Sequence, residues 1–374
     1  MKKKGAGRHS MLWVALISVA LGLLIGAIVI AVLGKNPFTA YYNLLQGSGL
    51  APKAKYAGGK SMLTDFSSYV DYWTPMIFAA LAVAVAMKAG LFNIGVSGQM
   101  LAAAFVTTVT VGYSTLAAPL AKPLALAVGL LTGAAVGALI GFFKYKFNIN
   151  EVVSSIMLNY IAQYVIAFFI NTFFVNPVSR QSEEVSAASR LTLHQIAIGG
   201  YKYDLPLGFL AAVAAVALVW FLFEKTVFGY ELKAIGANRE AARYAGIKVG
   251  RGIVLSMAIS GALAGLAGVT YFLGYFASIQ PRVLPDTGFD AIAVCLLGGS
   301  NPAGIVVASF LIQIIDKGAT YMSSQAGLES EIAAVITGVI LLSSACGVFY
   351  QTIGRRLQAK RRAAREQKGG AAHE

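Results

Sequence analysis

Long apolar stretches separated by short polar segments run along almost the whole chain. A helix needs about 20 mostly apolar residues to cross the hydrocarbon core of a bilayer, and on that scale the pattern predicts about ten spans. These spans cover residues 11–33, 73–87, 99–120, 123–143, 152–175, 206–223, 253–276, 289–297, 302–315 and 331–350. The second, eighth and ninth are short for a complete crossing. The pattern therefore predicts an all-α, polytopic membrane protein with broken or re-entrant segments.

Two long polar segments, 34–72 and 176–205, separate predicted spans, and we expect short surface helices in both.

The apolar run 11–33 is longer than the core of a usual signal peptide, and no convincing cleavage site follows it. We therefore expect a retained first helix. The predicted organisation is a basic N-terminus at 1–10, a transmembrane domain at 11–350 and a basic tail at 351–374.

The composition and the charge agree with this interpretation. The chain is 57% hydrophobic and 12% charged, whereas a soluble domain is roughly 25% charged. If the N-terminus is cytoplasmic, 20 of the 30 Lys and Arg residues fall in segments on the inner side of the membrane. An even number of spans then makes the C-terminus cytoplasmic too. The net charge of +14 therefore indicates anchoring beside anionic lipid rather than nucleic-acid binding.

The residues that usually carry catalysis, metal binding or nucleotide binding are not grouped. Cys295 and Cys346 lie in separate apolar runs without CxxC spacing, and the three histidines are scattered. A phosphate-binding loop of the form G-x-x-x-x-G-K-[ST] is approached only at residues 59–61, but Ala54 stands where its first glycine is required. We therefore expect a protein without enzymatic activity, cofactor or ATP site of its own.

Residues 88–100 (KAGLFNIGVSGQM) are poor continuous helix, because three glycines and two amides interrupt the apolar pattern. Broken backbone at membrane depth is tolerated only inside protein or beside water, and it often marks a transport path. The alternative is an ordinary short loop. Residues 296–305 (LLGGSNPAGI) form a second, similar interruption. The predicted path residues near these breaks, or at polar positions within spans, are Phe92, Asn93, Gln99, Asn159, Gln163 and Gln313.

Amides and aromatic rings suit a neutral solute, because amides both donate and accept hydrogen bonds and rings stack on flat surfaces. For each amide, a helix-to-helix hydrogen bond is an equally good explanation. Glycines spaced four apart also recur, and these predict close helix packing rather than function. The spaced glycines are Gly22 and Gly26, Gly129, Gly133, Gly137 and Gly141, and Gly261 and Gly265.

A polar segment at 224–250 joins two spans on the predicted inner side, and it carries both signs of charge and exposed small residues. It is either a solvated loop or a short helix that fits a groove on a cytoplasmic partner.

Four runs occur here in the order GLFNIGVSGQM, KFNINEVVSSIMLNYIA, FGYELKAIGANREAARYAGI and LLGGSNPAGI. Together they resemble the permease subunits of ABC importers for simple sugars, nucleosides and branched-chain amino acids, most closely the nucleoside branch. The resemblance extends from about residue 73 to residue 350. It implies a second permease subunit, a cytoplasmic ATPase subunit that binds ATP and Mg²⁺, and an external solute-binding lipoprotein.

By the same resemblance, the segment 224–250 couples to the ATPase. Its candidate residues are Gly229, Glu231, Gly236, Asn238, Arg239, Glu240, Ala241, Arg243 and Gly246. Members of the family often carry glutamate where this chain has Ser97, so the role of that carboxylate does not transfer. The expected solute is a nucleoside, with a simple sugar as the alternative. A secondary transporter or channel is a weaker alternative, because the predicted span centres are nearly free of charge.

Overall fold

The computed structural model describes residues 4–56, 58–347, 349–350 and 352 of the chain. The first three residues of the predicted N-terminal segment, and the predicted tail apart from residue 352, lie outside the described residues. The helices are α1 Lys4–Val32, α2 Pro37–Gly47, α3 Met62–Lys88, α4 Val96–Thr107, α5 Ala118–Phe147, α6 Glu151–Phe169, α7 Leu207–Lys225, α8 Val227–Ala237, α9 Arg239–Tyr244, α10 Val249–Val269, α11 Thr287–Leu297, α12 Pro302–Ala326 and α13 Glu331–Ala345. Three of them continue into π-helical segments, η1 Thr108–Gly112 after α4, η2 Ile170–Phe174 after α6 and η3 Thr270–Phe276 after α10.

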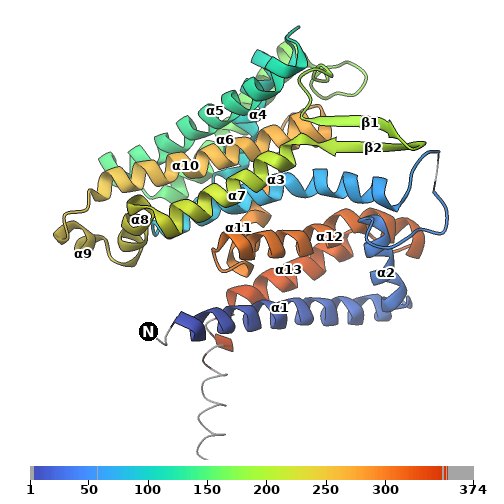
Figure 1. Ribbon diagram of the computed structural model, residues 1–374, viewed down its shortest axis with the longest axis horizontal. Helices are drawn as coiled ribbons and strands as arrows, with labels where there is room; N and C mark the ends of the chain where they lie inside the picture. The colour runs from blue at the N-terminus through green and yellow to red at the C-terminus, as the bar shows by residue number, and fades with distance from the viewer. Residues whose placement is uncertain (1–3, 57, 348, 351, 353–374) are drawn as a thin grey trace, which may run out of the picture.

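Seven helices in the described part of the chain are long and apolar enough to cross a membrane. Three shorter apolar helices, 96–112, 287–297 and 331–345, complete the set that the apolar pattern predicts. The helices α8 and α9 lie at one end of the bundle, and a β-hairpin lies at the opposite end (Figure 1). A side chain at Gly347, just after α13, would touch Val14 of α1. The chain therefore enters and leaves the bundle at the end that holds α8 and α9, which agrees with the predicted orientation.

Several span boundaries differ from the sequence prediction. The helix α3 begins at Met62 rather than residue 73, and α12 continues to Ala326 rather than ending at 315. Both extensions are polar turns, which the apolar pattern does not mark. The capping box formed by Ser61 and Thr64 fixes the start of α3. The predicted run 99–120 is in fact two helices, because η1 ends at Gly112 and α5 starts at Ala118.

The two polar outer segments differ from each other. The first contains α2, as expected, but the second contains a hairpin instead of a helix, with strands β1 Thr192–Ile198 and β2 Tyr201–Pro206. Gly199 and Gly200 form its turn, and both have positive φ angles, +59° and +84°. Two consecutive residues with positive φ make the tight turn that favours two-residue hairpins.

Helix α3 runs through the centre of the bundle, and its residues 76–86 are buried on every side. The predicted glycine packing holds where α5 crosses α10. A Cβ atom built on Gly133 would lie 2.2 Å from the carbonyl oxygen of Gly261, and one built on Gly265 would lie 2.1 Å from that of Gly129. The two backbones therefore touch directly. Because lipid is as apolar as the helix surfaces, helices in a membrane associate through close packing of this kind rather than through burial of apolar surface.

Candidate functional site

The connection between α3 and α4 folds back into the protein. Helix α3 ends at Lys88, Gly90 turns the chain with a φ of +67°, and residues 91–95 are not helical. Ser260 of α10 donates a hydrogen bond to the carbonyl of Ala82 (2.7 Å) and accepts one from Asn93 Nδ2 (2.8 Å). Ala82 lies one and a half turns before the end of α3, about 9 Å from it. Asn93 is therefore inside the bundle, and α4 starts at membrane depth.

Side-chain amides satisfy the backbone of this break. Asn93 Oδ1 accepts from the N–H of Gly95 (2.9 Å), and Asn93 Nδ2 donates to Gln99 Oε1 (3.0 Å). Asn159 of α6 accepts from the N–H of Gly98 (2.9 Å) and donates to the carbonyl of Ile94 (3.0 Å). The first N–H groups of a helix have no partner within the helix, and leaving them unpaired in a dry interior costs free energy. The amides therefore satisfy the backbone of a helix start that is buried in the protein.

The predicted eighth span, 289–297, corresponds to the short helix α11, which a non-helical segment at 277–286 precedes. The segment 277–286 starts beside η3 at the outer end, and α11 continues from it toward the inner end, where Cys295 Sγ lies 3.8 Å from Met87 Sδ. The break between α3 and α4 meets this chain where segment 277–286 passes into α11. Ser97 Oγ donates to the carbonyl of Pro285 (2.8 Å), and a Cβ atom on Gly288 would lie 2.3 Å from Ser97 Oγ. The start of α4 therefore packs directly on the start of α11.

The second predicted break, at 296–305, is a tight turn from α11 into α12. Gly299 and Ser300 both have positive φ angles, and Asn301 caps α12 through Ala303 N (3.0 Å). Gly298 and Gly304 pack on each other across the turn. Together with residues 277–286, this turn explains why the apolar run around α11 is so short.

The six predicted path residues are not brought together at one cavity. Asn93, Gln99, Asn159 and Gln313 are buried, and the first three take part in the bonds that hold the start of α4. Phe92 is half-buried, as is Gln163, whose amide donates to the carbonyl of Arg282 (2.5 Å). In this conformation the amides of Asn93, Gln99, Asn159 and Gln163 bond to neighbouring segments of the protein. Their role in a transport path stays a prediction.

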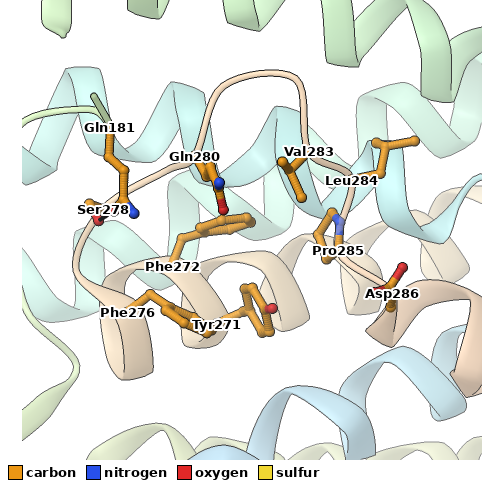
Figure 2. Close-up of a pocket in the computed structure, with 10 residues that line it drawn as sticks. All are labelled: Gln181, Tyr271, Phe272, Phe276, Ser278, Gln280, Val283, Leu284, Pro285 and Asp286. Carbon is orange, nitrogen blue, oxygen red and sulfur yellow. Dashed lines mark hydrogen bonds between the residues drawn. The ribbon is translucent and has the colours of Figure 1, made fainter. Parts of the chain in front are cut away.

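A cavity of about 130 Å³ lies between η3 and the segment 277–286. Figure 2 shows the rings of Tyr271, Phe272 and Phe276 below the segment that carries Gln280 and Val283. Gln181, Ser278 and Asp286 also line it. The sequence reasoning missed this cavity. The π-helical end of α10 places Tyr271 and Phe276 on one side of it, and no local pattern signals a π-helix.

Charged groups gather at the outer part of α12. Tyr72 donates to Asp316 Oδ2 (2.5 Å), and Lys317 donates to the hydroxyl of Tyr275. The Lys317 ammonium also lies 4.5 Å from the centre of the Tyr275 ring. Because α12 continues to Ala326, these groups lie within a helix rather than at the predicted span end. Ring faces and hydroxyls compensate the two charges at this depth.

The predicted coupling segment forms two short helices, α8 and α9. Glycines allow α8 to pack closely, since a Cβ on Gly229 would lie 1.9 Å from the Leu222 carbonyl oxygen and one on Gly236 would lie 2.4 Å from that of Lys88. Asn238 caps α9 through the N–H groups of Glu240 and Ala241 (3.0 Å each). These residues fix the shape of the helix pair, and Gly246, with a φ of +80°, turns the chain after it.

The exposed side of this helix pair carries large side chains that the sequence reasoning did not single out. Tyr230 is 70% exposed and Tyr244 is 93% exposed, beside exposed Val227 and Ala241. Glu231 is half-buried. Exposed tyrosines at a polar end of a membrane protein are typical of contact residues for a protein partner.

Arg239 links the helix pair to the broken segment. Its guanidinium donates to the carbonyl of Gly90 at 3.0 Å. Arg243 instead pairs with Glu240 (3.3 Å), and both side chains are 68% exposed. A surface pair of this kind contributes little to stability. Of the two arginines, Arg239 is therefore the one in contact with the membrane-embedded break.

Comparison with known proteins agrees with this architecture. Residues 67–345 match the family described as branched-chain amino acid transport system / permease component. A guanosine ABC transporter permease protein of Bacillus subtilis is 35% identical over 94% of this chain and 98% of its own length. A nucleoside ABC transporter permease protein of Lactococcus lactis is 34% identical over 88% of this chain and 89% of its own. A glucose ABC transporter permease protein of Haloferax volcanii is 27% identical over 74% of this chain and 75% of its own.

Proposed function

The chain belongs to the family of permease components of branched-chain amino acid transport systems, and on that premise we propose that the solute it carries is a nucleoside. It is a multi-pass membrane protein and a transport subunit of an ABC importer rather than an enzyme. One observation carries the choice of solute, the similarity to two nucleoside permeases over 88–94% of this chain. A simple sugar is the second candidate, supported by the lower similarity to the glucose permease.

An ABC permease works with subunits that hydrolyse ATP and deliver the solute. We propose that the ATPase subunit contacts the exposed side of α8 and α9, where Tyr230 and Tyr244 project. The bond from Arg239 to Gly90 would then carry a movement of the helix pair into the broken segment. A solute-binding lipoprotein would dock at the opposite end, near the hairpin (Figure 1). A second permease subunit, identical or homologous, would complete the pathway.

Arginine variants test this coupling. We expect Arg239→Ala to leave ATP hydrolysis running while transport falls, because the contact with Gly90 is lost. Arg243→Ala is the matched control, since the Arg243 side chain pairs with the exposed Glu240 and not with the broken segment. The measurement is the number of solute molecules imported per ATP hydrolysed by the assembled importer. Equal ratios in the two variants would reject the proposed route.

We also propose that Asn93 and Gln99 line the path in the conformation that releases solute. Replacing both by alanine should then abolish uptake. Because both amides also hold the start of α4, the amount of folded protein in the membrane is measured in parallel. Normal uptake by the double variant at normal membrane levels would reject this role.

The proposed solute is tested by uptake in cells. Deleting the gene should abolish import of tritiated guanosine at low external concentration, and the gene on a plasmid should restore it. An excess of unlabelled nucleosides should compete, whereas an excess of ribose or glucose should not. Competition by a sugar alone would favour the second candidate, and unchanged guanosine import after deletion would reject the first.

A further inference from the structure

The non-helical segment 277–286 lies at membrane depth and still exposes polar side chains. The outer loop places its start, since the N–H of Ser186 donates to the Gly112 carbonyl and the N–H of Val185 donates to that of Ala277. Its end, Pro285, accepts a hydrogen bond from Ser97. Ser97 precedes Gly112 by fifteen residues on the continuous run of α4 and η1, so the end of the segment lies about 22 Å deeper than its start at 1.5 Å per residue. The segment therefore descends through much of the roughly 30 Å hydrocarbon layer.

Lipid is an unsuitable neighbour for this segment. Gln280, Arg282 and Asp286 are exposed in the described structure, and the backbone that carries them is not helical. Non-helical backbone occurs at membrane depth only where protein buries it or where it lines water. Ionisable groups at that depth likewise face a bundle interior or an aqueous cavity. The exposed side of 277–286 therefore faces water or the second permease subunit rather than lipid.

The cavity beneath this segment combines two kinds of surface. Tyr271, Phe272 and Phe276 provide ring faces and edges on one side (Figure 2). The Asp286 carboxylate lies at its deep end, immediately before α11, and makes no capping bond to that helix. On the opposite side Ser278 Oγ donates to Gln181 Oε1 (2.6 Å), which orients the amide.

We propose that this cavity holds the solute inside the permease and that its composition selects a nucleoside. This inference rests on the proposed function. The nucleobase packs against the aromatic side chains, since it has two flat faces that a sugar lacks. The Asp286 carboxylate accepts hydrogen bonds from the sugar hydroxyls, which a free nucleobase lacks. The cavity of about 130 Å³ accommodates only part of such a solute, and the remainder extends along the exposed side of 277–286.

Cysteine accessibility tests whether the segment lines water. The full chain carries Val283→Cys in a background with Cys295→Ala and Cys346→Ser, and a charged, membrane-impermeant methanethiosulfonate reagent is added outside. Val283 is 45% exposed, and the matched control Leu218→Cys is 67% exposed in the middle of α7. We expect Val283→Cys to react at least tenfold faster, because the charged reagent does not enter lipid. Guanosine in excess should slow this reaction, and ribose should not. Equal rates at the two positions would overturn the proposal.

Uptake of tritiated guanosine by cells that contain the whole importer tests the contacts. Loss of a hydrogen bond to a charged group predicts at least a tenfold fall for Asp286→Asn. Loss of a ring wall predicts a fall for Phe276→Ala as well. The controls are Glu329→Gln, an exposed outer carboxylate, and Phe38→Ala, an 85% exposed ring on α2, and both should transport normally.

The outcomes separate the two proposals. If the unaltered importer takes up guanosine while Asp286→Asn and Phe276→Ala match their controls, the cavity is not the solute site, although the proposed function stands. If the unaltered importer takes up no guanosine, the proposed function itself fails. A fall in both variants with normal membrane levels, together with protection of Val283→Cys by guanosine, supports the assignment.

Discussion

Replacing Asn159 with leucine should destabilise the protein strongly, because this one amide satisfies two buried backbone groups. It accepts from the Gly98 N–H and donates to the Ile94 carbonyl. Each buried polar group left unpaired costs about 1–3 kcal/mol, so the variant should lose about 2–6 kcal/mol. Leucine has a similar branched shape but neither a donor nor an acceptor, so both backbone groups lose their partner.

The chain contains a reporter for this measurement. Cys295 is fully buried and becomes reactive when the bundle opens, whereas Cys346 is exposed and is replaced by serine. A thiol-reactive fluorophore then reports thermal unfolding in detergent. We expect the midpoint for Asn159→Leu to fall by several degrees. The control is Asn171→Leu, an exposed amide in η2. Equal midpoints for the two variants would show that the amide does not support the start of α4.

Three further predictions follow from single contacts. Gly133→Ala should reduce the amount of folded protein in the membrane, because the new methyl group meets the Gly261 backbone. Gly338→Ala is the control and should be tolerated, because no atom lies within 4 Å of the added methyl group. Equal membrane levels of the two variants would contradict the packing argument. Ser97→Ala removes one hydrogen bond worth about 1 kcal/mol, so amide hydrogen exchange in 277–286 should become faster. An unchanged exchange rate would show that the contact between Ser97 and Pro285 does not hold this segment. Tyr244→Ala should reduce co-purification of the ATPase subunit without lowering the unfolding midpoint, and unchanged co-purification would exclude this contact.

The apolar pattern predicted the spans well, because crossing a bilayer demands long apolar runs. It failed where a helix leaves the lipid. Residues 62–72 of α3 and 316–326 of α12 are helical but polar, so hydropathy does not separate them from a loop. The hairpin did carry a signal, since Gly199-Gly200 stands between two short runs that read as strands. That signal lay in a segment assigned to surface helices.

The candidate site was predictable only in part. Glycines and amides marked the break at 88–100, because those residues disfavour a continuous helix. Its partner was not predictable, since the contact between Ser97 and Pro285 joins residues 188 positions apart and neither carries a local signal. The position of residues 277–286 was not predictable either. Residues 277–286 read as a loop, and only the three-dimensional arrangement brings them to membrane depth.

The central claim is that this chain moves a nucleoside with energy supplied by ATP hydrolysis on a separate subunit. It is tested most directly by reconstituting the purified permease, its ATPase subunit and its solute-binding protein in liposomes. We predict that tritiated guanosine accumulates only when ATP and Mg²⁺ reach the ATPase subunit, and that an ATPase variant unable to hydrolyse ATP abolishes accumulation. Accumulation driven by a proton or sodium gradient in liposomes that contain the permease alone would contradict the account.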